Sequence, residues 1–271
     1  MTIHDQTIQS DAHEPAGEPV LKVRNLHLAF GAVKALDDIS LDIMPGEILA
    51  IVGPNGAGKS SLLNSISGFY TPTQGTISFL GQELIGMSAN QVAHLGLART
   101  FQNIQLYLGM STLDNLLSGR HIHSRGGILS AILRPWGRRD EIKQRKAVEE
   151  IMHFLELQPY RDVPVGTFGY GIRKRVDLGR ALAMEPNLLL LDEPMAGMTI
   201  DEKEDMVRFI LELRERRGIP IVLVEHDMQV ISEIADRVVV LDWGRHVATG
   251  TPDTVLRIPE VVSAYLGSDD T

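Results

Sequence analysis

The chain has 271 residues, of which 44% are apolar and 23% charged, a composition typical of a globular protein with one large or two small domains. Its net charge of −9 argues against nonspecific nucleic-acid binding as the main activity, and we expect no nucleic-acid partner. The absence of cysteine excludes disulfides and thiolate metal sites, and no apolar run approaches the ~18 residues that span a bilayer. We therefore expect a soluble, cytoplasmic chain whose membrane role, if it has one, comes through a partner.

Apolar, β-branched runs alternate with segments of helical spacing along most of the chain. Residues 1–17 are the exception: they are polar and acidic, so we expect a disordered tail without a secretory signal. Strands are predicted at 20–23, 48–52, 75–79, 188–191, 219–224 and 238–241. Helices are predicted at 60–67, 148–155 and 206–213, the last ended by Gly218. This alternation indicates an α/β fold with a mostly parallel sheet.

The region from about 88 to 162 differs from the rest because it has helical periodicity and few strand signals. We expect an inserted helical subdomain there. Within it, residues 119–139 combine basic side chains with an apolar patch in an otherwise acidic protein. A solvated surface excursion is one interpretation of this basic insertion, and a docking or membrane-surface element is the other.

A complete phosphate-binding loop, G-x-x-x-x-G-K-[ST], follows the strand at 48–52 and precedes a predicted helix. Its glycines let the backbone turn tightly and point successive N–H groups at an anion. Lys59 can reach the β- and γ-phosphates of a nucleotide, and the Ser60 hydroxyl can ligate Mg²⁺. The residues predicted to bind the nucleotide are Gly53, Pro54, Asn55, Gly56, Ala57, Gly58, Lys59, Ser60 and Ser61.

Two carboxylates follow the apolar strand at 188–191, where open α/β sheets bind their ligands. Asp192 can hold Mg²⁺, directly or through water. Glu193 points differently and can polarise an attacking water as a general base. A turn or a helix start is the other interpretation of this Asp-Glu-Pro sequence, but the phosphate loop upstream favours a site.

Two more polar residues are candidates for the same site. His226 follows the strand at 219–224, where it can contact the γ-phosphate and the attacking water. Gln102 can contact the metal and the same water through its amide. Neither is specific alone, since the chain has nine histidines and a lone glutamine carries little information. The predicted catalytic residues are thus Glu193, His226, Gln102 and Lys59, and the predicted metal ligands are Ser60, Gln102 and Asp192.

In this order the motifs resemble those of the ATP-binding subunit of an ABC transporter. The phosphate loop matches Walker A, Gln102 the Q-loop, Asp192 and Glu193 Walker B with its catalytic glutamate, and His226 the switch histidine. Phe30 falls where the family places an aromatic that stacks on adenine, and core packing is its other interpretation. The implied cofactors are ATP and Mg²⁺.

The resemblance covers residues 19–267 and implies a particular architecture. This is a P-loop NTPase core (RecA-like, ABC type) with an N-terminal antiparallel β subdomain and an inserted α-helical subdomain. The expected domain spans 18–267, with its core at about 18–87 and 163–250 and the helical subdomain at about 88–162. Residues 268–271 would form a short tail.

Finer features resemble the branched-chain (hydrophobic) amino acid importer family, which also includes importers of amides and urea. They are the sequence Thr100-Phe101-Gln102-Asn103-Ile104, the insertion at 119–139, Ala196-Gly197-Met198, and the ending Ala264-Tyr265-Leu266-Gly267. In this family two ATPase subunits sandwich two ATP molecules, each touching Walker A of one chain and the signature motif of the other. The resemblance implies a second ATPase subunit, two membrane permease subunits and, indirectly, an extracytoplasmic solute-binding protein. It also implies a location on the inner face of the cell membrane.

The signature motif departs from the family pattern Leu-Ser-Gly-Gly-Gln. Here the matching residues are Phe168, Gly169, Tyr170, Gly171 and Ile172. Gly169 replaces the serine whose hydroxyl would reach the γ-phosphate on the partner chain, while Gly169, Tyr170 and Gly171 still offer backbone groups at a helix N-terminus. A lost hydrogen bond to a charged phosphate weakens the site by roughly ten- to a hundredfold. Thr199 also stands where an Asp or Asn often closes the D-loop.

Because the signature acts in trans, its change affects the ATP site built on the partner's Walker A. We therefore hypothesise that the chain pairs with a paralogue that carries the better signature, although a pair of identical chains is the alternative. Two other functions stay open: a soluble ABC-type ATPase that is not coupled to transport, and a nucleotide-binding regulatory module with little turnover. Of these three, an importer subunit explains most of the motifs.

Overall fold

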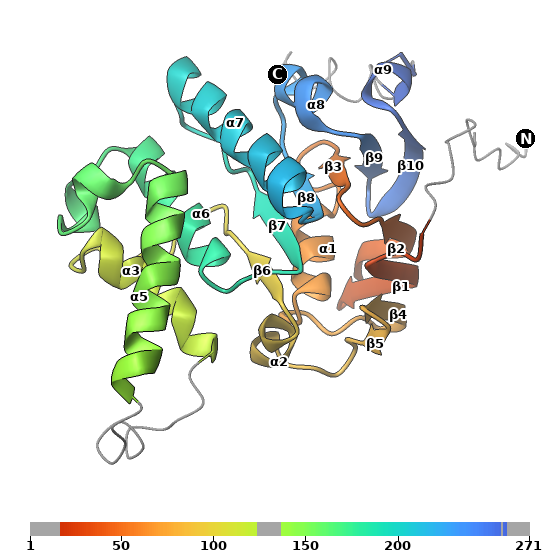
Figure 1. Cartoon of the computed structure of the whole chain (residues 1–271). Coiled ribbons are helices and arrows are strands. Elements are labelled where there is room, and N and C mark those ends of the chain that lie inside the picture. Colours follow the sequence, from red (N-terminus) through yellow and green to blue (C-terminus); the bar gives the residue numbers. More distant parts are fainter. Residues whose placement is uncertain (1–16, 124–136, 256, 259–271) are drawn as a thin grey trace, which may run out of the picture.

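Figure 1 shows the computed structural model, which describes residues 17–123, 137–255 and 257–258. Two β-sheets lie side by side, with helices around the larger one, and the expected α/β class is confirmed. Residues 1–16 of the expected tail at 1–17, the expected tail at 268–271, and residues 124–136 of the basic insertion lie outside the described residues. In the part of the chain that is described, no helix is both long and apolar enough to cross a membrane.

The larger sheet has six strands in the order β10-β9-β3-β8-β7-β6. These strands are β3 (Ile48–Val52), β6 (Leu97–Arg99), β7 (Leu188–Asp192), β8 (Ile221–Val224), β9 (Arg237–Asp242) and β10 (Arg245–Gly250). All neighbours are parallel except β9 and β10, which form a hairpin. Every residue of β3, β7 and β8 is buried, as expected for strands covered on both faces. Their carboxyl ends meet at one edge of the sheet.

The smaller sheet is antiparallel, in the order β2-β1-β4-β5. Its strands are β1 (Leu21–Phe30), β2 (Val33–Ile43), β4 (Gln74–Phe79) and β5 (Gln82–Glu83). The alternating burial of β1 and β4 is typical of strands with one solvated face. The first hairpin carries Phe30 at its turn, and its second strand lies beside the phosphate loop, since the backbone of Asp37 donates to Gly244 and that of Gly244 to Ala57.

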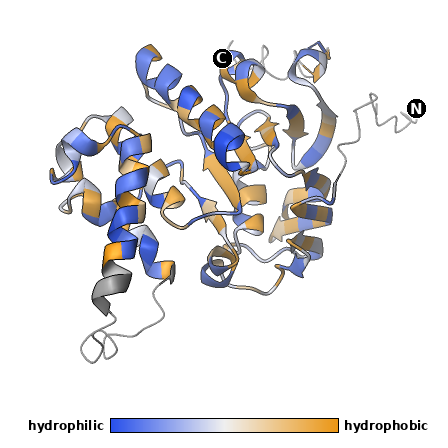
Figure 2. Cartoon of the chain, in the orientation of Figure 1, coloured by the Kyte–Doolittle hydropathy of each residue, from blue (hydrophilic) through white to orange (hydrophobic). Residues whose placement is uncertain are grey.

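Helices cover the larger sheet and form a separate group on one side of the molecule (Figure 1). They are α1 (Lys59–Ile66), α2 (Ala89–His94), α3 (Thr112–Gly119), α5 (Gly137–Phe154), α6 (Tyr170–Leu182), α7 (Ile200–Arg217), α8 (Met228–Ile234) and α9 (Pro252–Val255), with 3-10 turns η1 (Arg120–His123), η2 (Gln158–Tyr160) and η3 (Val165–Thr167). In the separate group, α3, α5 and α6 pack on one another. Figure 2 shows apolar strands at the centre and a largely hydrophilic outer face on α7.

The structure differs from the sequence expectation within the region 88–162. Residues 97–99 form the strand β6, which pairs with β7 at the edge of the larger sheet, so this segment packs with the core. A strand of three residues is too short to give a period, which is why the sequence pattern misses it. In contrast, α7 ends at Gly218 as expected, because this glycine adopts the left-handed conformation of a helix C-cap, with φ 62°.

Thr199, which departs from the usual D-loop residue, begins α7 with a complete capping box. Its hydroxyl accepts from the N–H of Glu202, whose carboxylate accepts from the N–H of Thr199. We expect Thr199→Ala to lower the free energy of unfolding by about 1 kcal/mol. Chemical denaturation measures this difference, and Thr199→Ser, which keeps the hydroxyl, is the matched control. Equal stability of the alanine and serine variants would contradict the capping role.

Candidate functional site

The phosphate loop connects β3 to α1, and its backbone is shaped by glycines with positive φ. Gly53 has φ 153° and Gly58 has φ 99°. A Cβ atom at Gly53 would lie 2.1 Å from the carbonyl oxygen of Leu241, and one at Gly58 would lie 2.7 Å from that of Ala35. Both positions therefore require glycine for steric as well as conformational reasons. Gly58 also caps α1 without any side-chain bond, so the N–H groups of the first turn are available to an anion.

Lys59 lies inside this loop. Its Nζ donates to the carbonyl oxygens of Gly53 at 2.6 Å and Pro54 at 3.0 Å, and the residue is buried. Burial lowers the pKa of Lys59, and the negative charges of Glu193 and Asp192 raise it in part. The next residue, Ser60, is exposed at the start of α1. The loop thus presents a cation, a helix N-terminus and a hydroxyl at one place, which suits a phosphate chain.

Asp192 ends β7 at the same edge of the sheet. Its Oδ2 accepts from Nη2 of Arg99 at 2.8 Å, and both side chains are almost fully buried. Among the described residues its Oδ1 is buried without a hydrogen-bond partner. A buried carboxylate oxygen without a partner is costly unless something else binds it. This orphaned oxygen, together with the Ser60 hydroxyl, provides the oxygen ligands that Mg²⁺ prefers.

Glu193 contacts two other residues that were predicted from the sequence. Its Oε2 accepts from Nε2 of Gln102 at 2.9 Å, and its Oε1 lies 2.8 Å from Nε2 of His226. These residues are 91 and 33 positions away from Glu193 in the chain, so only the fold brings them together. The Glu193 backbone has φ 49°, an unfavourable conformation for a residue with a side chain. Strain of this kind is often found at functional sites.

Near Glu193 lie two buried charged residues, Lys174 and Glu225, that the sequence pattern did not single out. Lys174 of α6 donates from Nζ to the carbonyl oxygen of Glu193 at 2.8 Å. Glu225, beside His226, accepts from the N–H of Met195 at 2.9 Å and from the N–H of His226 at 3.2 Å. Burial lowers the pKa of Lys174 and raises the pKa of Glu225. Both residues hold backbone segments of the site in place, and no motif marks them.

The Lys174 contact joins the start of α6 to the strained backbone of Glu193. We expect Lys174→Met to reduce ATP turnover roughly tenfold, because a hydrogen bond from a charged donor is lost. ATP affinity should change little, since within the described part of the chain the Lys174 ammonium donates to the Glu193 carbonyl and not to the phosphate loop. Steady-state kinetics test this, with Arg173→Met as control, because the adjacent arginine bonds to Gly166 instead. Equal losses in the two variants would contradict a specific role for Lys174.

Phe30 is half exposed, at 49% of its surface, so it does not serve the core packing that was its alternative interpretation. Its ring contacts that of Tyr70 edge to face, with 5.1 Å between centroids. An exposed aromatic pair offers an apolar surface to a planar ring. Phe30 comes from the first hairpin, whose second strand lies beside the phosphate loop, and Tyr70 comes from the segment that follows α1, the helix of the phosphate loop.

The signature residues lie at the start of α6. Gly169 is the N-cap of the helix and makes no side-chain cap bond, and Tyr170 is exposed. A Cβ at Gly169 would meet nothing within 4 Å, whereas one at Gly171 would lie 2.1 Å from the carboxylate of Glu202. A side chain at Gly171 would therefore have to displace the Glu202 carboxylate from its capping bond with Thr199. Gly169 has no such neighbour, and its φ of −61° is open to any residue.

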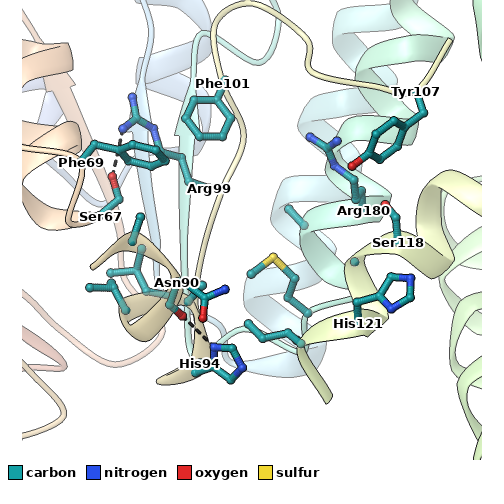
Figure 3. Close-up of a pocket in the computed structure, with 18 residues that line it drawn as sticks. Ser67, Phe69, Asn90, His94, Arg99, Phe101, Tyr107, Ser118, His121 and Arg180 are labelled. Atoms are coloured by element: carbon teal, nitrogen blue, oxygen red, sulfur yellow. Dashed lines mark hydrogen bonds between the residues drawn. The ribbon is translucent and has the colours of Figure 1, made fainter. Parts of the chain in front are cut away.

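A cleft of about 530 Å³ separates the larger sheet from the group of α3 and α6. Figure 3 shows Phe69, Arg99 and Phe101 on one wall and Tyr107, Ser118 and Arg180 on the other. The segment between Phe101 and Tyr107, which carries Gln102, crosses from one wall to the other. Gln102 is therefore next in the chain to Phe101, a residue of the cleft wall.

A glycine-shaped anion loop after one strand, with carboxylates at the end of another parallel strand of the same sheet, defines a P-loop nucleoside triphosphatase. Residues 36–196 match the family model of the ABC transporter, and residues 245–271 match that of the branched-chain amino acid ATP-binding cassette transporter. The chain therefore belongs to the ABC transporter family as an ATP-binding subunit, and the expectation of an ATP hydrolase of this type is confirmed.

Relatives and solved structures agree with this assignment. The chain is 36% identical over 253 residues to the high-affinity branched-chain amino acid transport ATP-binding protein BraF of Pseudomonas aeruginosa, a match that covers 92% of this chain and 98% of BraF. It is also 36% identical over 254 residues to LivG of Escherichia coli K12, with the same coverage. The crystal structure of the ADP conformation of MJ1267, an ATP-binding cassette of an ABC transporter, is 31% identical and superposes with a TM-score of 0.81 over 93% of this chain and all of that one.

Proposed function

We propose that the chain is the ATP-hydrolysing subunit of an importer for branched-chain amino acids or related small solutes. The observation that carries the hydrolytic part is the convergence of Gln102 and His226 on the Glu193 carboxylate beside the phosphate loop. The cargo is inferred from the names of BraF and LivG and from the match of residues 245–271. The cargo itself does not touch an ATP-binding subunit, so it leaves no mark on this site.

Each residue of the site has a role in the proposed reaction. Lys59 and the first-turn N–H groups of α1 bind the phosphates, and Glu193 accepts a proton from the attacking water as a general base. His226 and Gln102 hold that carboxylate and the water in line with the γ-phosphate. Ser60, Gln102 and Asp192 would hold Mg²⁺, which neutralises charge on the β- and γ-phosphates when it is bound.

Phe30 is proposed to stack on the adenine ring. We expect Phe30→Ala to weaken ATP binding about tenfold, because stacking of a base on an aromatic ring is lost. Phe30→Tyr keeps a ring of the same shape and should bind ATP as the wild type does. Isothermal titration with ATP measures both affinities. An unchanged affinity in the alanine variant would show that the exposed pair Phe30 and Tyr70 serves another purpose.

Hydrolysis is proposed to need a second ATPase subunit, which is a copy of this chain or a paralogue. The signature residues Gly169, Tyr170 and Gly171 would face the phosphates bound to the partner's loop. Gly169 offers backbone groups and a helix N-terminus but no hydroxyl. We therefore favour a paralogue with the better signature, so that the strong site of the pair uses Lys59 and Glu193 of this chain.

The proposed location is the inner face of the cell membrane, where the pair of ATPase subunits would bind two membrane permease subunits. The cleft beside Gln102 supports this arrangement. It has aromatic residues on both walls, which suit an apolar helix face. An extracytoplasmic solute-binding protein would act through the permeases and would not contact this chain.

The first test is Mg²⁺-dependent ATP hydrolysis by the purified chain over a range of protein concentrations. Lys59→Met removes the phosphate-binding cation and is the control. Activity that depends on Lys59 and rises steeply with concentration supports hydrolysis by a pair of identical chains. ATP binding with very slow turnover supports the paralogue. Failure to bind ATP at all would refute the proposed function.

A further inference from the structure

Arg99 is a buried arginine whose contacts converge on the predicted metal site. Its Nη2 donates to Oδ2 of Asp192 at 2.8 Å, and the exposed fractions of these side chains are only 6% and 4%. Its Nη1 donates to Oδ1 of Asn64 at 2.7 Å and to Oγ of Ser67 at 3.0 Å. One guanidinium therefore holds the Asp192 carboxylate and two polar groups at the end of the phosphate-loop helix.

These contacts fix the distance between two structural elements. Asn64 lies on α1, which begins at the phosphate loop and carries Ser60, and Asp192 ends β7. Arg99 bridges the C-terminal end of α1 and the end of β7, so it ties the helix that carries Ser60 to the strand that carries Asp192. It also leaves Oδ1 of Asp192 without a partner among the described residues. A planar guanidinium can make these bonds at once, and a lysine ammonium cannot make them in the same geometry.

The opposite side of the guanidinium faces the cleft. The ring of Phe101 lies over it, with 5.0 Å from Cζ to the ring centroid, and Phe69 packs edge to face on Phe101 at 5.6 Å. Arg99, Phe101 and Phe69 together line one wall of the cleft (Figure 3). A shift of Phe101 therefore changes what Arg99 can hold.

We propose that Arg99 is a positioning residue for Asp192 that connects the metal site to the wall of the cleft. It orients the carboxylate so that one oxygen binds Arg99 and the other is free for the metal. Displacement of Phe101 by an occupant of the cleft would loosen Arg99 and so weaken the hold of Asp192 on the metal. The metal role of Asp192 rests on the proposed function.

The test measures metal binding without hydrolysis. Mn²⁺, a paramagnetic substitute for Mg²⁺, is titrated into the purified chain with ADP and followed by electron paramagnetic resonance. We expect Arg99→Lys to raise the Mn²⁺ concentration for half-saturation roughly ten- to a hundredfold, as loss of an outer-shell partner does. ADP affinity in EDTA should be unchanged. Asn64→Ala keeps the ion pair and should show a smaller rise in the same direction, in a variant that we expect to fold.

The matched control is Arg237→Lys, which makes the same substitution in a part-buried arginine that is bound to Glu47. Arg237 begins β9, at the amino ends of the parallel strands and so at the other end of the sheet from Asp192. It should leave both measurements unchanged. If the Mn²⁺ concentration for half-saturation were unchanged or lower in Arg99→Lys, the inference would be overturned. An equal loss of ADP affinity with and without metal would also overturn it. If the wild type binds ADP without any effect of Mn²⁺, the proposed metal site itself is refuted.

The link to the cleft is tested in the same assay. As a single substitution, Phe101→Leu should raise the Mn²⁺ concentration for half-saturation several-fold. In the Arg99→Lys background it should add no further rise, since both changes act through one contact. Tyr107→Leu, on the opposite wall, is the control and should have no effect. Additive effects of Phe101→Leu and Arg99→Lys would overturn the link between the cleft and the metal site.

Discussion

A Glu193→Gln variant is expected to lose ATP turnover by about 10²- to 10⁴-fold, the range typical of a removed general base, while it still binds ATP. The carboxylate lies within hydrogen-bond distance of Gln102 and His226, at 2.9 and 2.8 Å. Glutamine has the same shape and still offers an oxygen and an N–H group to these neighbours. Binding should persist because Lys59 and the α1 N-terminus do not contact the Glu193 side chain in the observed hydrogen-bond network.

Two measurements separate the roles of binding and chemistry in this variant. Isothermal titration gives the ATP affinity, and a phosphate-release assay gives the turnover. Glu204→Gln is a matched control, since this glutamate is exposed on α7 and far from the site in the chain. If Glu193→Gln kept a tenth or more of the wild-type turnover, another group would have to act as the base.

The parts of the fold that the sequence predicts well are those with continuous apolar runs. The strands at 48–52 and 188–191 correspond to β3 and β7, because burial on both faces requires every residue to be apolar. The sequence pattern does not predict β2, because Asp37 and Asp38 interrupt the apolar alternation of this strand. In the structure Asp38 has φ 62° and lies at a register shift with β1. A local pattern cannot anticipate a bulge that the partner strand imposes.

Most of the predicted site residues share a different property, since they belong to a motif with a fixed local spacing or follow a predicted strand, whereas Gln102 and Phe30 are placed by the family resemblance. Arg99 and Lys174 have neither signal, and Glu225 follows the predicted strand at 219–224 but was not singled out because nothing local distinguishes its role from that of His226. Arg99 and its partner Asp192 are 93 positions apart, and Lys174 and Glu193 are 19 apart on different elements. Sequence shows that these charges exist, and only the fold shows which buried charges neutralise one another. The positioning residues of the site are therefore the part that required the structure.

The second large effect concerns the signature. Gly169→Ser is expected to raise ATP turnover of the chain roughly ten- to a hundredfold, because the new hydroxyl adds a hydrogen bond to a charged phosphate. The structure has room for it, since a Cβ at Gly169 meets nothing within 4 Å. The serine would also cap α6, which now has no side-chain cap, with a gain of a few tenths of a kcal/mol in stability. Gly169→Ala fits the same space without a hydroxyl and is the control.

The gain should appear in trans, and a mixing experiment shows whether it does. A double variant, Gly169→Ser with Lys59→Met, supplies a good signature but no working phosphate loop, so alone it should be inactive. Mixed with the wild type, it completes the site on the wild-type Lys59, and the mixture should turn over faster than either chain alone. The same mixture made with Gly169→Ala and Lys59→Met should show no gain. If Gly169→Ser raised turnover alone and the mixture did not, the signature would act on the phosphate loop of its own chain, and the paired arrangement would be wrong.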